Sequence, residues 1–123
     1  MPRRKSVKER RIDAPMLAHH VDEQVRLLKS EPEWQTGVED GITLAKYPHM
    51  RVVLVALKKG IRMKEHKVKG PMSLFVVSGK VTLIADKQEF QLKQKWHFTL
   101  RTAVLHDVQA NTDAVILMTI MAM

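Results

Sequence analysis

The twenty residues GIRMKEHKVKGPMSLFVVSG, from Gly60 to Gly79, decide which fold the chain is expected to adopt. They form two segments, separated by a Gly-Pro pair at positions 70–71 and closed by a Ser-Gly turn at 78–79. Gly and Pro interrupt regular structure, whereas Leu74–Val77 is rich in the branched and aromatic residues that favour strands. His66 lies near the end of the first segment. The stretch therefore predicts two strands, with a histidine where the first one ends.

Strand-like segments continue on both sides of this stretch. A hairpin is expected about the Ser-Gly turn, and Asp86-Lys87 is expected to turn the chain again. About eight or nine short strands, with turns every 8 to 12 residues or so, predict an all-β sandwich or barrel. The expected strands, besides one ending near His66, are Ile42–Tyr47, Arg51–Leu57, Leu74–Val77, Lys80–Ala85, Glu89–Leu92, Trp96–Leu100, Val104–Ala110 and Ala114–Met121.

Two of these strands, Arg51–Leu57 and Ala114–Met121, are apolar on both alternating faces. A barrel strand needs one apolar face for the interior, so the outer face must be covered by a helix or by another subunit. We therefore expect a homodimer, with the outer faces of some strands in the interface.

The N-terminal part differs in character from the rest. Residues 1–12 are dense in like charge and lack apolar periodicity, which predicts a flexible basic arm. Asp13 and Pro15 resemble the start of a helix, and the apolar spacing predicts an amphipathic helix over about 15–28. His19 and His20 on that helix are interpreted as surface residues, and Trp34 is expected to cap the core.

Composition limits the function classes. The 123 residues, with no cysteine, fit a single domain without disulfides, thiolate metal sites or a cysteine nucleophile. No apolar run is long enough to span a bilayer, and we expect a cytoplasmic protein without a membrane partner. The net charge of +8 is concentrated in the arm and around the quoted stretch. The arm is either a solvated tail or a tether for nucleic acid.

The quoted stretch resembles the first motif of the cupin superfamily: glycine, five residues, His-x-His, three or four residues, glutamate, six residues, glycine. Gly60, His66 and Gly79 match this motif. Val68 occupies the position of the second histidine, and Met72 that of the glutamate. The frame of the motif is therefore present, whereas two of its usual metal ligands are replaced.

The second cupin motif runs glycine, five residues, Pro-x-Gly, two residues, histidine, three residues, asparagine. Of these, His106 matches, while Lys95, Arg101, Ala103 and Ala110 replace the other residues. The phrases VVSGKV and HDVQA are similar to those of small bacterial single-domain cupins. The resemblance implies a cupin-type double-stranded β-helix, or jelly-roll barrel, over about 41–121 within one domain at 13–123.

Cupin metal sites use three imidazoles and a carboxylate, so the resemblance implies a degenerate site in this chain. Two imidazoles make a weak and unselective site, and a divalent transition metal at low occupancy is the expectation if any is bound. Glu65 is expected to point away from its neighbour His66. His49 or His97 would supply a third nitrogen only if it faced inward.

The sequence leaves several functions open and names no substrate. The leading interpretation is a pocket that binds a small molecule, lined by His66, Val68, Met72, Phe75 and His106. In the enzyme alternatives the two histidines are the candidate catalytic residues or metal ligands of a dioxygenase-like or isomerase-like cupin. They are otherwise core histidines that hold strand ends together. Nucleic-acid binding through the arm is the alternative of a different class.

Overall fold

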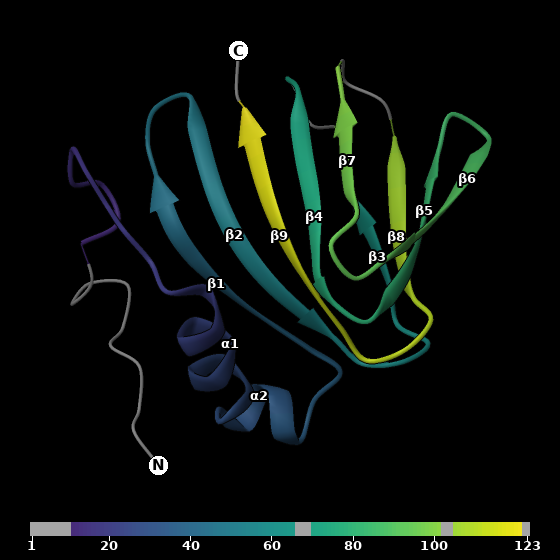
Figure 1. Cartoon of the computed structure of the whole chain (residues 1–123), viewed down its shortest axis with the longest axis horizontal. Coiled ribbons are helices and arrows are strands. Elements are labelled where there is room, and N and C mark those ends of the chain that lie inside the picture. Colours follow the sequence, from purple (N-terminus) through teal and green to yellow (C-terminus); the bar gives the residue numbers. More distant parts are fainter. Residues whose placement is uncertain (1–10, 66–69, 102–104, 122–123) are drawn as a thin grey trace.

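The computed structural model describes residues 11–65, 70–101 and 105–121, and in them two short helices precede a series of antiparallel strands (Figure 1). The expected all-β fold is confirmed. None of the helices described is long and apolar enough to cross a membrane. The elements are α1 (Val21–Lys29), α2 (Pro32–Gln35), β1 (Glu39–Lys46), β2 (Met50–Leu57), β3 (Arg62–Glu65), β4 (Met72–Ser78), β5 (Lys80–Ala85), β6 (Gln88–Lys93), β7 (His97–Leu100), β8 (His106–Ala110) and β9 (Ala114–Met121).

The strands form two antiparallel sheets. The large sheet has the order β1-β2-β9-β4-β7, and the small sheet has the order β3-β8-β5-β6. Strands that follow one another in the chain are often far apart in these orders, so the pairing is largely non-local. The chain passes between the sheets several times, which ties them into one unit with a shared interior (Figure 1).

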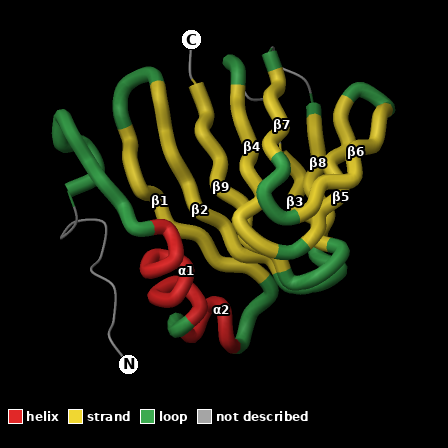
Figure 2. Tube along the Cα trace, in the orientation of Figure 1, coloured by secondary structure: helices red, strands yellow, loops and turns green. Residues whose placement is uncertain are grey.

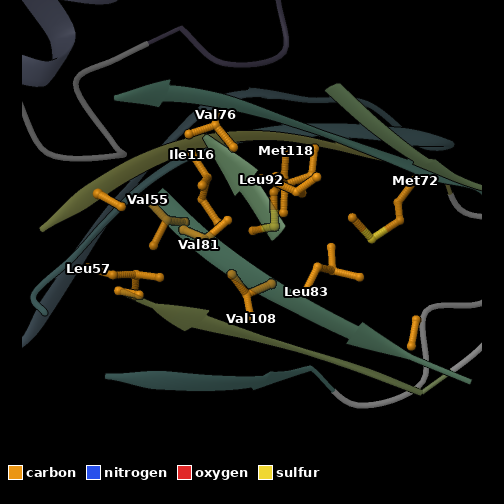
Figure 3. Close-up of a cluster of buried hydrophobic side chains, with 14 residues drawn as sticks. Val55, Leu57, Met72, Val76, Val81, Leu83, Leu92, Val108, Ile116 and Met118 are labelled. Atoms are coloured by element: carbon orange, nitrogen blue, oxygen red, sulfur yellow. The ribbon is translucent and has the colours of Figure 1, made fainter. Parts of the chain in front are cut away.

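The main core fills the space between the two sheets (Figure 3). Every strand except β1 contributes to it, and the contributing residues alternate because successive side chains of a strand point to opposite faces. Burying a side chain such as Leu or Ile contributes about 1.5–3 kcal/mol, so this layer is the principal source of stability. Its buried members are Val55, Leu57, Met72, Leu74, Val76, Val81, Leu83, Ala85, Leu92, Val108, Ala110, Ala114, Ile116 and Met118.

A second core covers part of the outer face of the large sheet. The two helices lie against β1 and β2 (Figure 2), and Leu28 and Trp34 are buried there against outward-facing strand residues. Trp34 is 8% exposed, which confirms its expected place over the core. Leu54 and Val115 belong to this second core, whereas Val55 and Ile116 belong to the first. Part of the apolar outer face of β2 and β9 is thereby covered within one chain.

The helix begins six residues later than expected. Residues 13–16 form bends, and α1 begins at Val21 because the His20 Nδ1 atom accepts the Glu23 N–H at 3.2 Å as an N-cap. The segment before it is held by the end of β1 instead. The Lys46 N–H donates to the Ile12 carbonyl at 2.7 Å, and the Tyr47 hydroxyl donates to the Ala14 carbonyl at 2.8 Å.

The prediction of a hairpin about the Ser-Gly turn is wrong. β4 lies in the large sheet and β5 in the small one, so this turn carries the chain from one sheet to the other. Gly79 has φ of +84°, and a Cβ atom added to it would lie 2.3 Å from the Asp113 carbonyl oxygen. Only glycine satisfies both demands without a shift of the backbone.

The next turn does form the expected hairpin. β5 and β6 pair in register from Lys80 opposite Lys93 to Ala85 opposite Gln88, and Asp86 and Lys87 connect them. Both connecting residues have positive φ, 50° and 63°. Positive φ at two successive residues is the geometry of the tight turn whose twist matches that of antiparallel strands.

Candidate functional site

His106 is the predicted site residue whose position is most informative. It begins β8 on the same face as Val108 and Ala110, which belong to the main core. Its side chain is 2% exposed. Among the described residues, Thr82 is the other buried side chain that carries a polar group. A buried polar ring in an apolar interior is costly unless something satisfies it, which makes this position notable.

His106 marks one end of the space between the sheets. β7 of the large sheet ends at Leu100, and β8 of the small sheet begins at His106, so the chain crosses between the sheets at this end. β3 ends here as well, and its last residue, Glu65, lies opposite His106 in register. On the other side of β8, His106 lies opposite Ala85 of β5. We refer to this part of the molecule, defined by His106, Leu100 and the start of β4, as the His106 end.

Met72 is the second predicted site residue that faces the interior. It begins β4, is 3% exposed, and lies opposite Leu100 and Ile120 on the two neighbouring strands. Leu100 and Ile120 also pack against the main core. The flexible thioether of Met72 thus belongs to an apolar wall at the His106 end.

Phe75 does not share that wall, and the expectation that it lines the same pocket is corrected. The main core takes Leu74 and Val76 from β4, and Phe75 between them lies on the opposite, outer face. The expectation failed because the run Leu74–Val77 is entirely apolar, so its composition does not show which residues face inward. His66 and Val68 lie outside the described residues, and their predicted roles stay predictions.

The remaining histidines that the structure describes do not complete a metal site with His106. His49 is exposed in the turn between β1 and β2. His97 is exposed and lies opposite Phe75, hence on the outer face of β7. His19 and His20 are exposed, as expected. A usual cupin metal set therefore does not form from the described imidazoles alone, and His66 is the candidate partner left to test.

A cluster of carboxylates lies elsewhere. Glu31, Glu33 and Asp40 place one oxygen each within 4.8 Å of one another, where α2 adjoins the start of β1. Carboxylate oxygens suit hard divalent cations rather than the transition metals of imidazole sites. This cluster is separate from the interior face on which His106 lies.

The outer face of the small sheet is polar next to the buried histidine. Arg62 on β3 donates to Asp107 on β8 through Nε at 3.0 Å and through Nη2 at 2.7 Å. Asp107 follows His106 directly, so its side chain lies on the other face of the strand. This ion pair joins the strands from outside and leaves the interior apolar.

The surface has hollows that are lined wholly by described residues, and two of them are described next. One of about 320 Å³ lies at the edge of the large sheet, where Ser73, Thr99 and Thr119 meet Arg101. The other, of about 420 Å³, is lined by Lys80, Gln91, Leu92, Lys93, Trp96 and Asn111. The second hollow was not predicted from the sequence. The available signal was a tryptophan three residues after the end of β6, a strand whose outward positions are polar.

Comparisons with known proteins rest on structure, since no family model and no curated protein matches the sequence. A cupin superfamily protein from Desulfitobacterium hafniense aligns with a TM-score of 0.67 at 14% identity, over 69% of this chain and 78% of that one. KdgF from a Halomonas species aligns with a TM-score of 0.62 at 16% identity, over 69% and 79%.

Salicylate 1,2-dioxygenase from Pseudoaminobacter salicylatoxidans, in a structure with gentisate, aligns with a TM-score of 0.74 at 14% identity. The match covers 98% of this chain and 37% of the dioxygenase. These similarities agree with the two antiparallel sheets of this chain. The chain therefore has the cupin fold.

Proposed function

We propose that this protein binds a small molecule at the His106 end of its barrel, without strong metal binding. The observation that carries the proposal is a 2% exposed imidazole on an otherwise apolar inner face. A neutral imidazole offers one hydrogen-bond donor and one acceptor, so it can orient a polar group of a ligand. Small-molecule sites in proteins combine mostly apolar walls with a few polar groups.

The neighbouring wall supports a ligand with an apolar part. Met72, Leu100 and Ile120 provide aliphatic surface on the large sheet at the same end. A methionine adjusts its shape more readily than a branched residue, because it has three rotatable bonds. We infer a small ligand with one polar group for His106 and an apolar remainder for this wall.

An enzymatic role is the alternative. The proteins of similar fold include a dioxygenase, which supports oxidative chemistry only as an analogy of fold. A metal-free role would use His106, with His66 as the second candidate, for proton transfer to and from the ligand. A metal-dependent role needs more ligands than the described histidines bring together.

The binding proposal is tested by the melting temperature of the protein in the presence of small carboxylic acids, sugars and aromatic acids. A true ligand raises the melting temperature of the unmodified protein, because it binds the folded state alone. We expect that rise to be lost in His106→Ala and kept in His49→Ala, which removes an exposed histidine. A ligand whose effect survives in His106→Ala does not bind at this site.

The metal alternative is tested by elemental analysis of protein purified without chelator or affinity tag. We expect less than about a tenth of an equivalent of transition metal, because few ligands converge. A stoichiometric metal that is lost in both His66→Ala and His106→Ala would replace the binding proposal with a metal-dependent one.

A homodimer remains a proposal. The helices cover part of the outer face of the large sheet, but Phe75 and Met121 lie on that face outside the second core. Met121 is 36% exposed. Light scattering at micromolar concentration is expected to give twice the chain mass. A monomer at that concentration would show that the outer face of the large sheet needs no cover beyond the two helices.

Nucleic-acid binding through the arm is the second alternative. Most of the arm lies outside the described residues, and its support is the six Lys and Arg residues among residues 1–11. Binding of this kind weakens steeply with salt and disappears when residues 1–11 are deleted. No detectable binding of DNA or RNA at about 50 mM salt would exclude it.

A further inference from the structure

The hollow on the outer face of the small sheet lies apart from the barrel interior. It lies where β5 begins and β6 ends, whereas His106 pairs with Ala85 at the other end of β5. The two ends of β5, Lys80 and Ala85, are five residue steps apart, or roughly 17 Å at the usual rise per residue. A ligand in this hollow would therefore not be the ligand of the His106 end.

Trp96 presents an aromatic surface at this hollow from a fixed backbone. Its side chain is 49% exposed. The backbone N–H of Trp96 donates to the Lys93 carbonyl at 2.9 Å, and the backbone carbonyl of Trp96 accepts the Val76 N–H at 2.9 Å. The preceding Lys95 has φ of +70°, a conformation that few residues other than glycine adopt. Because the backbone of Trp96 is already fixed, a flat ligand that stacks on its exposed ring needs to order only the side chain.

Two side-chain amides at the hollow are oriented by one buried hydroxyl. Thr82 Oγ is 2.8 Å from Gln91 Oε1 and 2.9 Å from Asn111 Oδ1. A hydroxyl has a single proton, so it donates to one of these amides and accepts from the NH₂ group of the other. One amide thus keeps its NH₂ group for a ligand, and the other keeps its carbonyl oxygen. The hollow is therefore provided with a neighbouring donor and acceptor.

Lys80 and Lys93 add two positive charges to the same hollow. They lie directly opposite each other in the register of β5 and β6. Two like charges directly opposite each other on paired strands destabilise the sheet. No ion pair joins either lysine to an acidic side chain in the described part of the chain. An anionic ligand would remove this repulsion.

From these features we propose that the hollow binds a phosphomonoester that carries a flat ring, as a mononucleotide does. A phosphomonoester carries about −1.5 to −2 charges at pH 7, which matches the lysine pair better than a single carboxylate does. The ring stacks on Trp96, and the two amides bond to a ring edge that offers one donor and one acceptor, as adenine does. The volume of about 420 Å³ lies in the usual range for small-ligand sites.

The test is calorimetric titration of the full chain with AMP, adenosine and inorganic phosphate at low salt. We expect AMP to bind at least about tenfold more tightly than either fragment, because each fragment lacks one of the two contacts. The Trp96→Ala variant is expected to lose about tenfold or more in AMP affinity, whereas Trp96→Phe keeps most of it. The Lys80→Gln/Lys93→Gln double variant is expected to lose a similar factor and the salt dependence.

The control variant is Lys59→Gln, which removes an exposed lysine outside the hollow and is expected to bind AMP normally. Circular dichroism of each variant checks that it is folded. A 5′-phosphorylated single strand that competes with AMP, and is equally sensitive to Trp96→Ala, would identify the end of a nucleic acid as the natural source. No AMP binding at 10 mM or so, or binding unchanged in both hollow variants, overturns the proposal. Binding that is lost only when residues 1–11 are deleted overturns it as well.

Discussion

The two tryptophans of this protein lie in similar chemical surroundings and differ in burial. Trp34 is 8% exposed, with Lys29 Nζ 5.5 Å and Lys58 Nζ 5.0 Å from its ring centroid. Trp96 is 49% exposed and shares a hollow with Lys80 and Lys93. At Trp34 the protein itself occupies the faces of the ring, whereas at Trp96 the ring is accessible. The comparison shows that the burial of the ring, rather than the types of residue around it, distinguishes a structural tryptophan from one whose ring is free to contact a ligand.

The largest expected effect that tests this comparison is on stability. Trp34→Ala should lower the free energy of unfolding by about 3–5 kcal/mol, because it leaves a cavity between the helices and the large sheet. Trp96→Ala should lower it by about 1 kcal/mol or less, because the side chain is half exposed. Urea unfolding of both variants measures the two values. Equal losses would show that Trp96 is a structural residue too.

A smaller effect is expected from the lysines at Trp34. Lys58→Gln should cost about 1 kcal/mol, because it removes a cation held against a largely buried ring. The Lys58 ammonium group also donates to the Gln35 carbonyl at 3.4 Å, a long and weak bond. Lys59→Gln, next in the chain and exposed, is the matched control and should be neutral. A neutral Lys58→Gln would mean that the ring contact contributes nothing.

The smallest effect should have the opposite sign. Lys93→Gln is expected to raise the free energy of unfolding by about 0.3 kcal/mol at low salt, because it relieves the repulsion from Lys80. The gain should fade as salt is added, since ions screen exposed charges. Thermal unfolding at two salt concentrations measures it. A loss of stability at low salt would indicate that Lys93 has a favourable partner in the folded protein.

Most of the strands could be predicted from the sequence, because alternating and fully apolar segments reflect burial directly. Lys80–Ala85 and Ala114–Met121 have the predicted bounds. The failures came from competition between distant segments. Asp13 and Pro15 resemble a helix start, but the end of β1 bonds to that segment. The turn at Gly79 resembles a hairpin, yet it packs closely against Asp113 and Ala114 and joins strands of different sheets.

The inward orientation of a candidate residue was predictable where a motif position could be aligned. His106 and Met72 face the interior, as the motif positions imply. Phe75 was misplaced because nothing in an uninterrupted apolar run marks the inward face. The hollow at Trp96 is assembled from β5, β6, the turn between β6 and β7, and the turn after β8, and no local pattern shows that these segments meet. Sites built from distant segments are therefore the part that the sequence alone does not show.

The position of β9 has a consequence for how the protein is made. This strand joins β2 to β4 at the centre of the large sheet, although it is the last strand of the sequence. The two halves of the sheet therefore cannot be joined until residues 114–121 have left the ribosome. Until then the apolar inner faces of β2 and β4 lack their shared neighbour. During synthesis the chain is thus expected to depend on chaperones for protection against aggregation.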